Sequence, residues 1–199
     1  MNIMSIIEIR NLTKRYKDSI VLSNINATFE EGLIYGLIGR NGSGKTLLLR
    51  CICGLVPVYE GQIWIGGTRV TATGSLPLDM GVIIETPGFL RNQTGFQNLK
   101  LLASIKGRIT DEEIYNAIVS VGLEPDMNKK VGKYSLGMRQ RLGIAQAVME
   151  NPPILLLDEP FNGLDNNGVI KMRELLLEQK MQGKTIILAS HNQTDIDML

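Results

Sequence analysis

The sequence predicts an α/β fold with a mainly parallel sheet, a small N-terminal antiparallel β subdomain and an inserted helical subdomain. Three observations predict it. A glycine-rich loop at 39–46 follows an apolar run at 33–38 and precedes a predicted helix. A second apolar run, at 154–159, has four consecutive aliphatic residues, which is typical of a strand buried on both faces. The segment 97–149 between them has a mostly helical pattern.

The loop reads Gly-Arg-Asn-Gly-Ser-Gly-Lys-Thr and fits the pattern G-x-x-x-x-G-K-[ST]. Its glycines allow successive backbone N–H groups to turn toward phosphate oxygens. Lys45 can reach the β- and γ-phosphates, and the Thr46 hydroxyl can ligand Mg²⁺. The helix predicted at 45–53 would present its N-terminus to the anion. We therefore predict a P-loop NTPase core that binds a nucleoside triphosphate through Gly39, Arg40, Asn41, Gly42, Ser43, Gly44, Lys45 and Thr46. The alternative is a glycine-rich turn with an incidental lysine, and the further motifs described below disfavour it.

The bulk composition is that of an ordinary globular domain. The 199 residues are 44% hydrophobic and 21% charged, with a formal net charge of +1, so nothing favours a nucleic-acid partner or an acidic membrane surface. The chain lacks a signal-peptide pattern and an apolar run long enough for a bilayer, so we expect a cytoplasmic protein. Cys51 and Cys53 are two apart on a predicted helix, which favours neither a disulfide nor a metal site.

The N-terminal part predicts the small antiparallel sheet. Three stretches have strand-like patterns, at 6–10, 21–29 and 62–66, and the second alternates apolar and polar residues. The polar stretch 67–77 is predicted to be a loop.

A short apolar strand at 81–84 leads to Glu85 and then to the helical part of the chain. We expect one domain over 1–199, with a core formed by 1–85 and 150–199 and a helical subdomain at about 86–149.

Two helix starts are marked within the helical subdomain. Thr110 and Glu113 form a capping box ahead of one apolar helix face, and Gly122 is the expected stop. Ser135 is a good N-cap for a helix that runs to about Met149.

The core resumes after the helical subdomain. The strand at 154–159 is followed by a helix near 168–182 and a further apolar strand at 185–190. Strand, helix and strand in this order imply a right-handed parallel crossover.

Asp158 and Glu159 end the buried strand, at the edge of the sheet where open α/β proteins bind their ligands. Asp158 can hold Mg²⁺ opposite Thr46, and Glu159 can polarise an attacking water. The alternative is that Asp-Glu-Pro merely ends a strand, and it is disfavoured beside a phosphate-binding loop.

The stretch Tyr134–Arg141 contains a second anion-binding device. Ser135 caps the helix and Gly137 permits close approach to a ligand. Alone, this pattern describes any capped helix. Together with the phosphate loop and Asp158-Glu159 it becomes specific.

These motifs, in this order, resemble the nucleotide-binding domain of ABC transporters, and the resemblance covers nearly the whole chain. Gly39–Thr46 matches Walker A and Ile154–Glu159 matches Walker B with its catalytic glutamate. Ser135-Leu136-Gly137-Met138 takes the place of the signature, where the family more often has Ser-Gly-Gly-Gln. The serine and the second glycine are kept, so phosphate contact by Ser135 and Gly137 is implied.

Further roles are implied by the resemblance. Asn162–Asp165 is similar to the D-loop, so Asp165 is a candidate nucleotide contact. His191 is similar to the switch histidine that contacts the γ-phosphate, although a lone histidine after a strand is more often structural. Tyr16 lies where the family stacks an aromatic ring on adenine, although a lone tyrosine in a polar segment is usually a surface residue. The implied catalytic residues are Glu159, His191 and Lys45.

Glu85 departs from the family, which mostly has a glutamine there that senses Mg²⁺ and the attacking water. Glu85 is therefore a candidate for nucleotide and metal contact. Glutamate followed by Thr-Pro-Gly-Phe, together with Tyr-Ser-Leu-Gly-Met, is similar to the bacitracin-resistance and lantibiotic-immunity branch, which defends bacteria against peptide antibiotics.

The resemblance implies an ATP-hydrolysing subunit that uses ATP and Mg²⁺ on the cytoplasmic face of the plasma membrane. Its expected partners are a transmembrane permease and a second nucleotide-binding domain, identical or not, placed head to tail. Because family members continue for longer after the switch histidine, we expect the chain to be part of a longer protein.

Two alternatives are an ABC ATPase that acts on DNA or ribosomes and an inactive nucleotide sensor. The first is disfavoured by the short interval between Lys45 and Ser135, which has no sustained heptads, and by the presence of one cassette only. The second is disfavoured by Asp158, Glu159 and His191.

Overall fold

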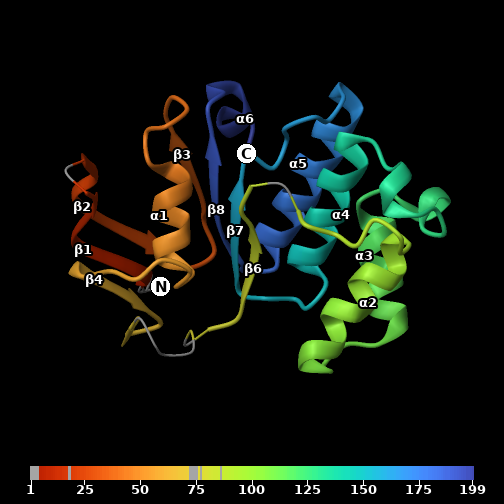
Figure 1. Cartoon of the computed structure of the whole chain (residues 1–199), viewed down its shortest axis with the longest axis horizontal. Coiled ribbons are helices and arrows are strands. Elements are labelled where there is room, and N and C mark those ends of the chain that lie inside the picture. Colours follow the sequence, from red (N-terminus) through yellow and green to blue (C-terminus); the bar gives the residue numbers. More distant parts are fainter. Residues whose placement is uncertain (1–4, 18, 72–75, 77, 86) are drawn as a thin grey trace.

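A computed structural model describes residues 5–17, 19–71, 76, 78–85 and 87–199 of the chain. Two sheets lie side by side, with one helix between them and further helices on the far side of the second sheet (Figure 1). The α/β class predicted from the sequence is confirmed.

The first sheet is antiparallel and lies at the N-terminal side of the molecule. Its strand order is β2-β1-β4-β5, with β1 at Ser5–Tyr16, β2 at Ser19–Glu30, β4 at Glu60–Ile65 and β5 at Thr68–Arg69. The three predicted strands are present, and the first continues six residues past its predicted end at Arg10. The prediction of a loop over 67–77 is wrong at β5, while residues 72–75 and 77 lie outside the described residues.

The second sheet is parallel and has the order β3-β8-β7-β6. Its strands are β3 at Ile34–Ile38, β6 at Met80–Ile83, β7 at Ile154–Asp158 and β8 at Thr185–Ser190. All residues of β7 and β8 are buried, because helices or the other sheet cover both faces. The predicted parallel crossover between β7 and β8 is confirmed.

The buried side chains of β7 divide between two hydrophobic clusters. Ile154 and Leu156 join the cluster that contains the antiparallel sheet and helix α1 (Lys45–Ile52). Leu155 and Leu157 join the cluster on the opposite face, where α4 (Leu136–Val148) and α5 (Asn166–Met181) pack (Figure 1). The parallel sheet therefore separates α1 from α4 and α5.

The chain between β6 and β7 is helical, as predicted. It contains α2 (Gly95–Lys106), α3 (Asp111–Ser120), the 3₁₀ turns η1 (Glu124–Asp126) and η2 (Val131–Lys133), and α4. The capping box of Thr110 and Glu113 is present, and Thr94 forms a second one with Gln97. Helix α4 lies directly against the sheet: a Cβ on Gly81 of β6 would be 1.9 Å from the Ala147 carbonyl oxygen. Only glycine fits there.

Two features near the C-terminal end of the chain differ from the sequence prediction. Helix α5 begins at Asn166, two residues before the predicted start, because Asp165 accepts a hydrogen bond from the Gly168 N–H at 2.9 Å and caps the helix. The short helix α6 (Gln193–Asp197) was not predicted. Among the described residues, no helix combines the length and apolar character that a bilayer span requires.

Candidate nucleotide site

The glycine-rich loop connects β3 to α1, so it lies at the carboxyl end of a parallel strand. Gly42 and Gly44 have φ values of 80° and 96°, in the left-handed region that glycine adopts without strain. A Cβ on Gly44 would also lie 2.8 Å from Leu22 Cδ2 and 3.3 Å from the Val21 carbonyl oxygen. The Ser43 N–H donates to the Arg40 carbonyl at 3.2 Å and closes the turn. The loop can therefore form a backbone cradle ahead of α1.

Lys45 lies over this loop. Its Nζ donates to the carbonyl oxygens of Gly39 and Arg40 at 2.7 and 3.3 Å, and lies 3.9 Å from Glu159 Oε1. These contacts hold the ammonium at the loop, on the side of Glu159, where a phosphate can replace the carbonyl partners.

Thr46 and Asp158 are joined across the first turn of α1 and the end of β7. The Thr46 hydroxyl donates to Asp158 Oδ2 at 2.7 Å. Asp158 is only 5% exposed, and its Oδ1 has no hydrogen-bond partner among the described residues. A buried carboxylate oxygen without a partner is costly and is therefore a candidate ligand for a cation.

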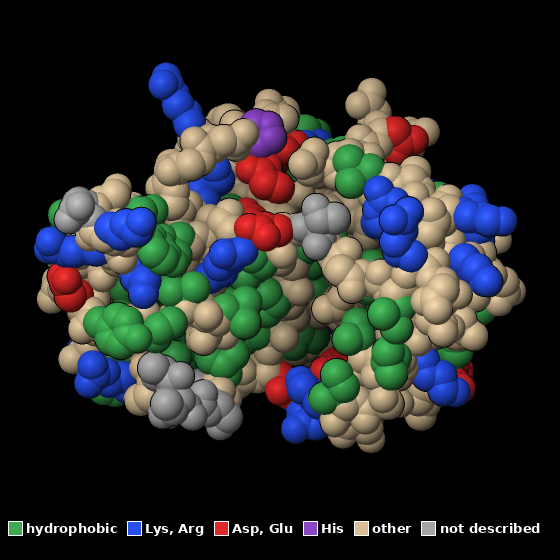
Figure 2. All heavy atoms as spheres, in the orientation of Figure 1, with side chains coloured by type: hydrophobic (Ala, Val, Ile, Leu, Met, Phe, Trp, Pro, Cys, Tyr) green, Lys and Arg blue, Asp and Glu red, His purple; other side chains and the backbone are tan. Residues whose placement is uncertain are grey.

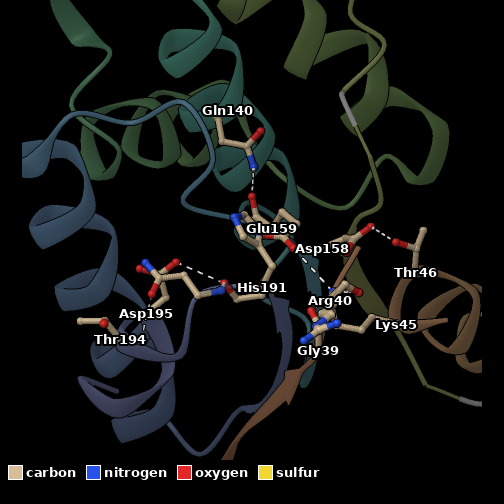
Figure 3. Close-up of polar contacts among 12 residues, drawn as sticks. Gly39, Arg40, Lys45, Thr46, Gln140, Asp158, Glu159, His191, Thr194 and Asp195 are labelled. Atoms are coloured by element: carbon tan, nitrogen blue, oxygen red, sulfur yellow. Dashed lines mark hydrogen bonds and ion pairs between the residues drawn. The ribbon is translucent and has the colours of Figure 1, made fainter. Parts of the chain in front are cut away.

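Glu159 directly follows β7 and has a φ of 47°, which is unusual for a residue other than glycine. Its N–H donates to the Ala189 carbonyl at 2.9 Å, so the ladder with β8 extends one residue past the strand. Its Oε2 lies 2.9 Å from His191 Nδ1, and Figure 3 shows the two side chains meeting beside Lys45. The structure thus brings together all three predicted catalytic residues.

Lys45, Thr46, Asp158 and Glu159 line one cavity of about 560 Å³, and His191 lies against Glu159 without lining it. Figure 2 shows the histidine of the chain next to acidic side chains on this face. The lining residues include most of the predicted nucleotide contacts, namely Tyr16, Asn41, Gly42, Ser43, Gly44, Lys45, Thr46 and Glu85, together with the predicted metal ligand Asp158 and the predicted catalytic residue Glu159. The predicted contacts Gly39 and Arg40 do not line it. Tyr16 lies at the edge of this cavity and is 52% exposed. Lys14 Nζ lies 5.7 Å from the centroid of its ring. The exposed part of the ring can stack on a base.

Glu85 lines the same cavity but is paired with a residue that the sequence analysis did not identify. Its Oε1 accepts a hydrogen bond from Arg50 Nη2 of α1 at 2.7 Å, with both side chains more than a third exposed. Glu85 adds negative charge beside Asp158 and Glu159, so a basic group that offsets this charge is expected nearby. No pattern in the sequence indicated that this group is Arg50. Thr86, the next residue of the subfamily motif, lies outside the described residues.

Ser135, Gly137 and Asp165 do not line this cavity. The Ser135 hydroxyl accepts a hydrogen bond from the Met138 N–H at 3.2 Å and caps α4. Gly137 contacts the loop before α5, since a Cβ there would be 2.6 Å from the Gly163 carbonyl oxygen. Within one chain, the predicted signature residues therefore lie outside the cavity formed by the phosphate loop.

A match to a known family agrees with this geometry. The profile of the family described as "ABC transporter" matches residues 22–162.

The chain belongs to the ABC transporter family.

Several ABC proteins are similar to most of its length. The ABC transporter ATP-binding protein YybJ of Bacillus subtilis (strain 168) is 50% identical over 96% of this chain and 87% of its own. The bacitracin transport ATP-binding protein BcrA of Enterococcus faecalis is 41% identical over 98% of this chain, and the lantibiotic transport ATP-binding protein SrtF of Streptococcus pyogenes is 35% identical over 97%. These relatives support the bacitracin and lantibiotic branch inferred from the sequence. The chain spans only 64% of the length of that BcrA.

Solved ABC cassettes have the same fold. The dimeric ATP-binding cassette MJ0796, in a post-hydrolysis state bound to ADP and Pi, has a TM-score of 0.88 and 26% identity, covering 96% of this chain and 90% of that one. This chain is thus an ATP-binding, ATP-hydrolysing ABC subunit. The comparisons give no support to the alternative of an ABC ATPase that acts on DNA or ribosomes.

Proposed function

We propose that this chain hydrolyses Mg²⁺-ATP as one of two cassettes that drive a membrane permease for peptide antibiotics. The observation that supports it most directly is that Lys45, Thr46, Asp158 and Glu159 line one cavity at the phosphate loop, with His191 against the Glu159 carboxylate. Each of these side chains has a separate task in phosphoryl transfer to water.

The residues present fit a magnesium ion. Asp158 offers a buried oxygen with no partner among the described residues, and Thr46 offers its hydroxyl beside it. No group of three or more His, Cys, Asp or Glu able to hold a metal occurs in the described ranges. That suits Mg²⁺, which keeps several waters and is bound through one or two protein groups plus substrate phosphates. When bound, it would offset charge on the phosphate oxygens. Glu85, paired with Arg50, is the weaker candidate ligand.

Glu159 is the proposed general base. Its carboxylate takes a proton from water as that water attacks the γ-phosphorus, and the bond to the β–γ bridging oxygen breaks. His191 Nδ1 holds Oε2 and so fixes the direction of the carboxylate. Lys45 exchanges its loop carbonyls for phosphate oxygens and stabilises the charge that moves onto them.

The site is proposed to be completed by a second cassette. Ser135 and Gly137 lie outside the cavity of their own chain, at the N-terminus of α4, where backbone N–H groups favour an anion. Two cassettes arranged head to tail would place this terminus, with Asp165 of the neighbouring loop, against the partner's triphosphate. The dimeric state of MJ0796 supports the pairing of two cassettes. The partner is an identical or a homologous cassette.

The proposed substrate class is peptide antibiotics of the bacitracin and lantibiotic type. It rests on Glu85 with the following Thr-Pro-Gly-Phe of the sequence, on Tyr-Ser-Leu-Gly-Met at 134–138, and on relatives named as bacitracin and lantibiotic transport proteins. The chain would bind the cytoplasmic side of its permease.

The test is to express the full protein in an antibiotic-sensitive bacterial host together with a candidate permease, chosen from neighbouring reading frames that encode several membrane spans. We expect raised resistance to bacitracin or a lantibiotic, which Glu159→Gln abolishes at equal protein level. Resistance that survives Glu159→Gln would contradict the ATPase role. Active ATPase without any change in resistance would contradict the substrate class alone.

A further inference from the structure

Helix α4 contains a buried glutamine that the mechanism above does not use. Gln140 is only 6% exposed, and its Nε2 donates a hydrogen bond to the backbone carbonyl oxygen of Glu159 at 3.2 Å. Figure 3 shows this side chain reaching from α4 to the Glu159 peptide, on the side away from Lys45. Gln140 does not line the nucleotide cavity. Its contact is with the main chain of the proposed general base.

That main chain is in a conformation that needs support. Glu159 has a φ of 47°, which its Cβ disfavours, and such strain persists only where the surroundings enforce it. Three hydrogen bonds do so: the N–H donates to Ala189, and the carbonyl accepts from the Asn162 N–H at 3.1 Å as well as from Gln140. The first two belong to β8 and to the turn that follows Glu159. Only the third comes from a distant helix.

We propose that Gln140 is a positioning residue for Glu159. By holding the carbonyl, it fixes the orientation of the adjoining peptide and with it the direction of the Cα–Cβ bond, so that the carboxylate stays beside His191 and the attacking water. This inference rests on the proposed role of Glu159 as general base. It predicts that loss of the Gln140 amide slows the chemical step and leaves nucleotide binding intact.

The variants are Gln140→Met, which keeps the length of the side chain without a donor, and Gln140→Glu, which keeps its shape but presents an acceptor to the carbonyl. We expect kcat to fall about 10- to 100-fold, the order that a misplacement near 1 Å brings. The apparent KM and the ATP affinity should stay within about twofold, because Gln140 is not in the nucleotide cavity. The matched control is Gln146→Met on the same helix, for which we expect the parent rate.

A second pair of measurements separates positioning from general damage to the fold. In a Glu159→Gln background there is no base to orient, so Gln140→Met should add no further loss of rate and should leave ATP-trapped dimers as abundant as before. The inference is overturned by a kcat within twofold of the parent, by an equal loss in the Glu159→Gln background, or by weakened ATP affinity or dimer trapping. Either variant suffices if the other does not fold. If Glu159→Gln itself keeps the parent rate, the proposed base is wrong, which is a different result.

Discussion

Asp158→Asn should stabilise the nucleotide-free protein and at the same time abolish its Mg²⁺-dependent binding of ATP. The carboxylate is 5% exposed, and among the described residues only Thr46 donates to it, at Oδ2. A buried polar group without a partner costs about 1–3 kcal/mol, and a charged one costs more. The asparagine amide has the same shape but no charge, so the substitution removes part of this cost. It also replaces the oxygen that is proposed to ligand the metal with an amino group.

We take the gain as about 1–2 kcal/mol, the lower part of that range, because asparagine keeps one oxygen and still needs a partner for its amino group. For 150–250 residues each kcal/mol shifts the melting temperature by about 2–4 °C, so Asp158→Asn should melt about 2–8 °C above the parent. Far-UV circular dichroism with EDTA and without nucleotide measures this, and calorimetric titration with Mg²⁺-ATP measures the lost affinity.

Two control variants bracket this result. Thr46→Val removes the hydroxyl donor and should lower the melting temperature, because Asp158 then loses the hydrogen bond to Oδ2. Asp165→Asn should leave it unchanged, because asparagine caps helices as well as aspartate does. A lower melting temperature for Asp158→Asn would refute the reasoning, since it would mean that the free carboxylate is already well satisfied.

Four further outcomes are expected. Glu159→Gln should bind ATP normally, hydrolyse it more slowly by orders of magnitude and trap a dimer visible by light scattering; parent-like turnover would remove it from its role. Glu85→Gln breaks an exposed pair with Arg50 worth less than about 1 kcal/mol, so it should leave stability and the Mg²⁺ dependence of the isolated subunit unchanged and impair only coupled transport; a shifted Mg²⁺ dependence contradicts this. Specific ATPase activity should rise with the concentration of the chain, because two chains complete a site; a fast rate independent of concentration would show that one suffices. Burial raises the pKa of the Cys51 thiol to about 11; because the unfolded thiol ionises first, unfolding free energy should fall as pH rises from about 9 toward 11, and native protein at pH 8 should resist alkylation that denatured protein undergoes.

The elements that the sequence predicted best are those whose burial is the same along their whole length. β7 is covered on both faces, so its aliphatic run indicates a parallel strand without ambiguity. The far half of β1 was missed because it is mostly polar: its buried positions are Leu12 and Lys14, so no apolar alternation marks it, and its antiparallel pairing is interrupted by register shifts after Ile9. α6 has five residues, too few for a helical periodicity. It is held by tertiary contacts such as Arg173 with Asp195, which local sequence does not encode.

Within the site, the residues that belong to a sequence motif were predicted, and the residues that contact another site residue without belonging to a motif were not. Lys45, Thr46 and Asp158 are recognisable because their spacing and position relative to a strand express their chemistry. Arg50 and Gln140 carry no such mark: one is a basic residue on an amphipathic helix and the other a glutamine within a helix. Their roles exist only where α1 meets the end of β6 and α4 meets the end of β7.

The separation of the signature from the phosphate loop follows from the order of the elements. α1 and α4 pack on opposite faces of the parallel sheet, as the division of β7 between the two hydrophobic clusters shows. The N-terminus of α1 carries the loop, and the N-terminus of α4 carries Ser135, so the two proposed anion-binding ends of one chain belong to helices on opposite faces of the sheet. Moving either helix across the sheet would expose an apolar face. This is the physical reason for the proposal that a second cassette supplies the other end to each triphosphate.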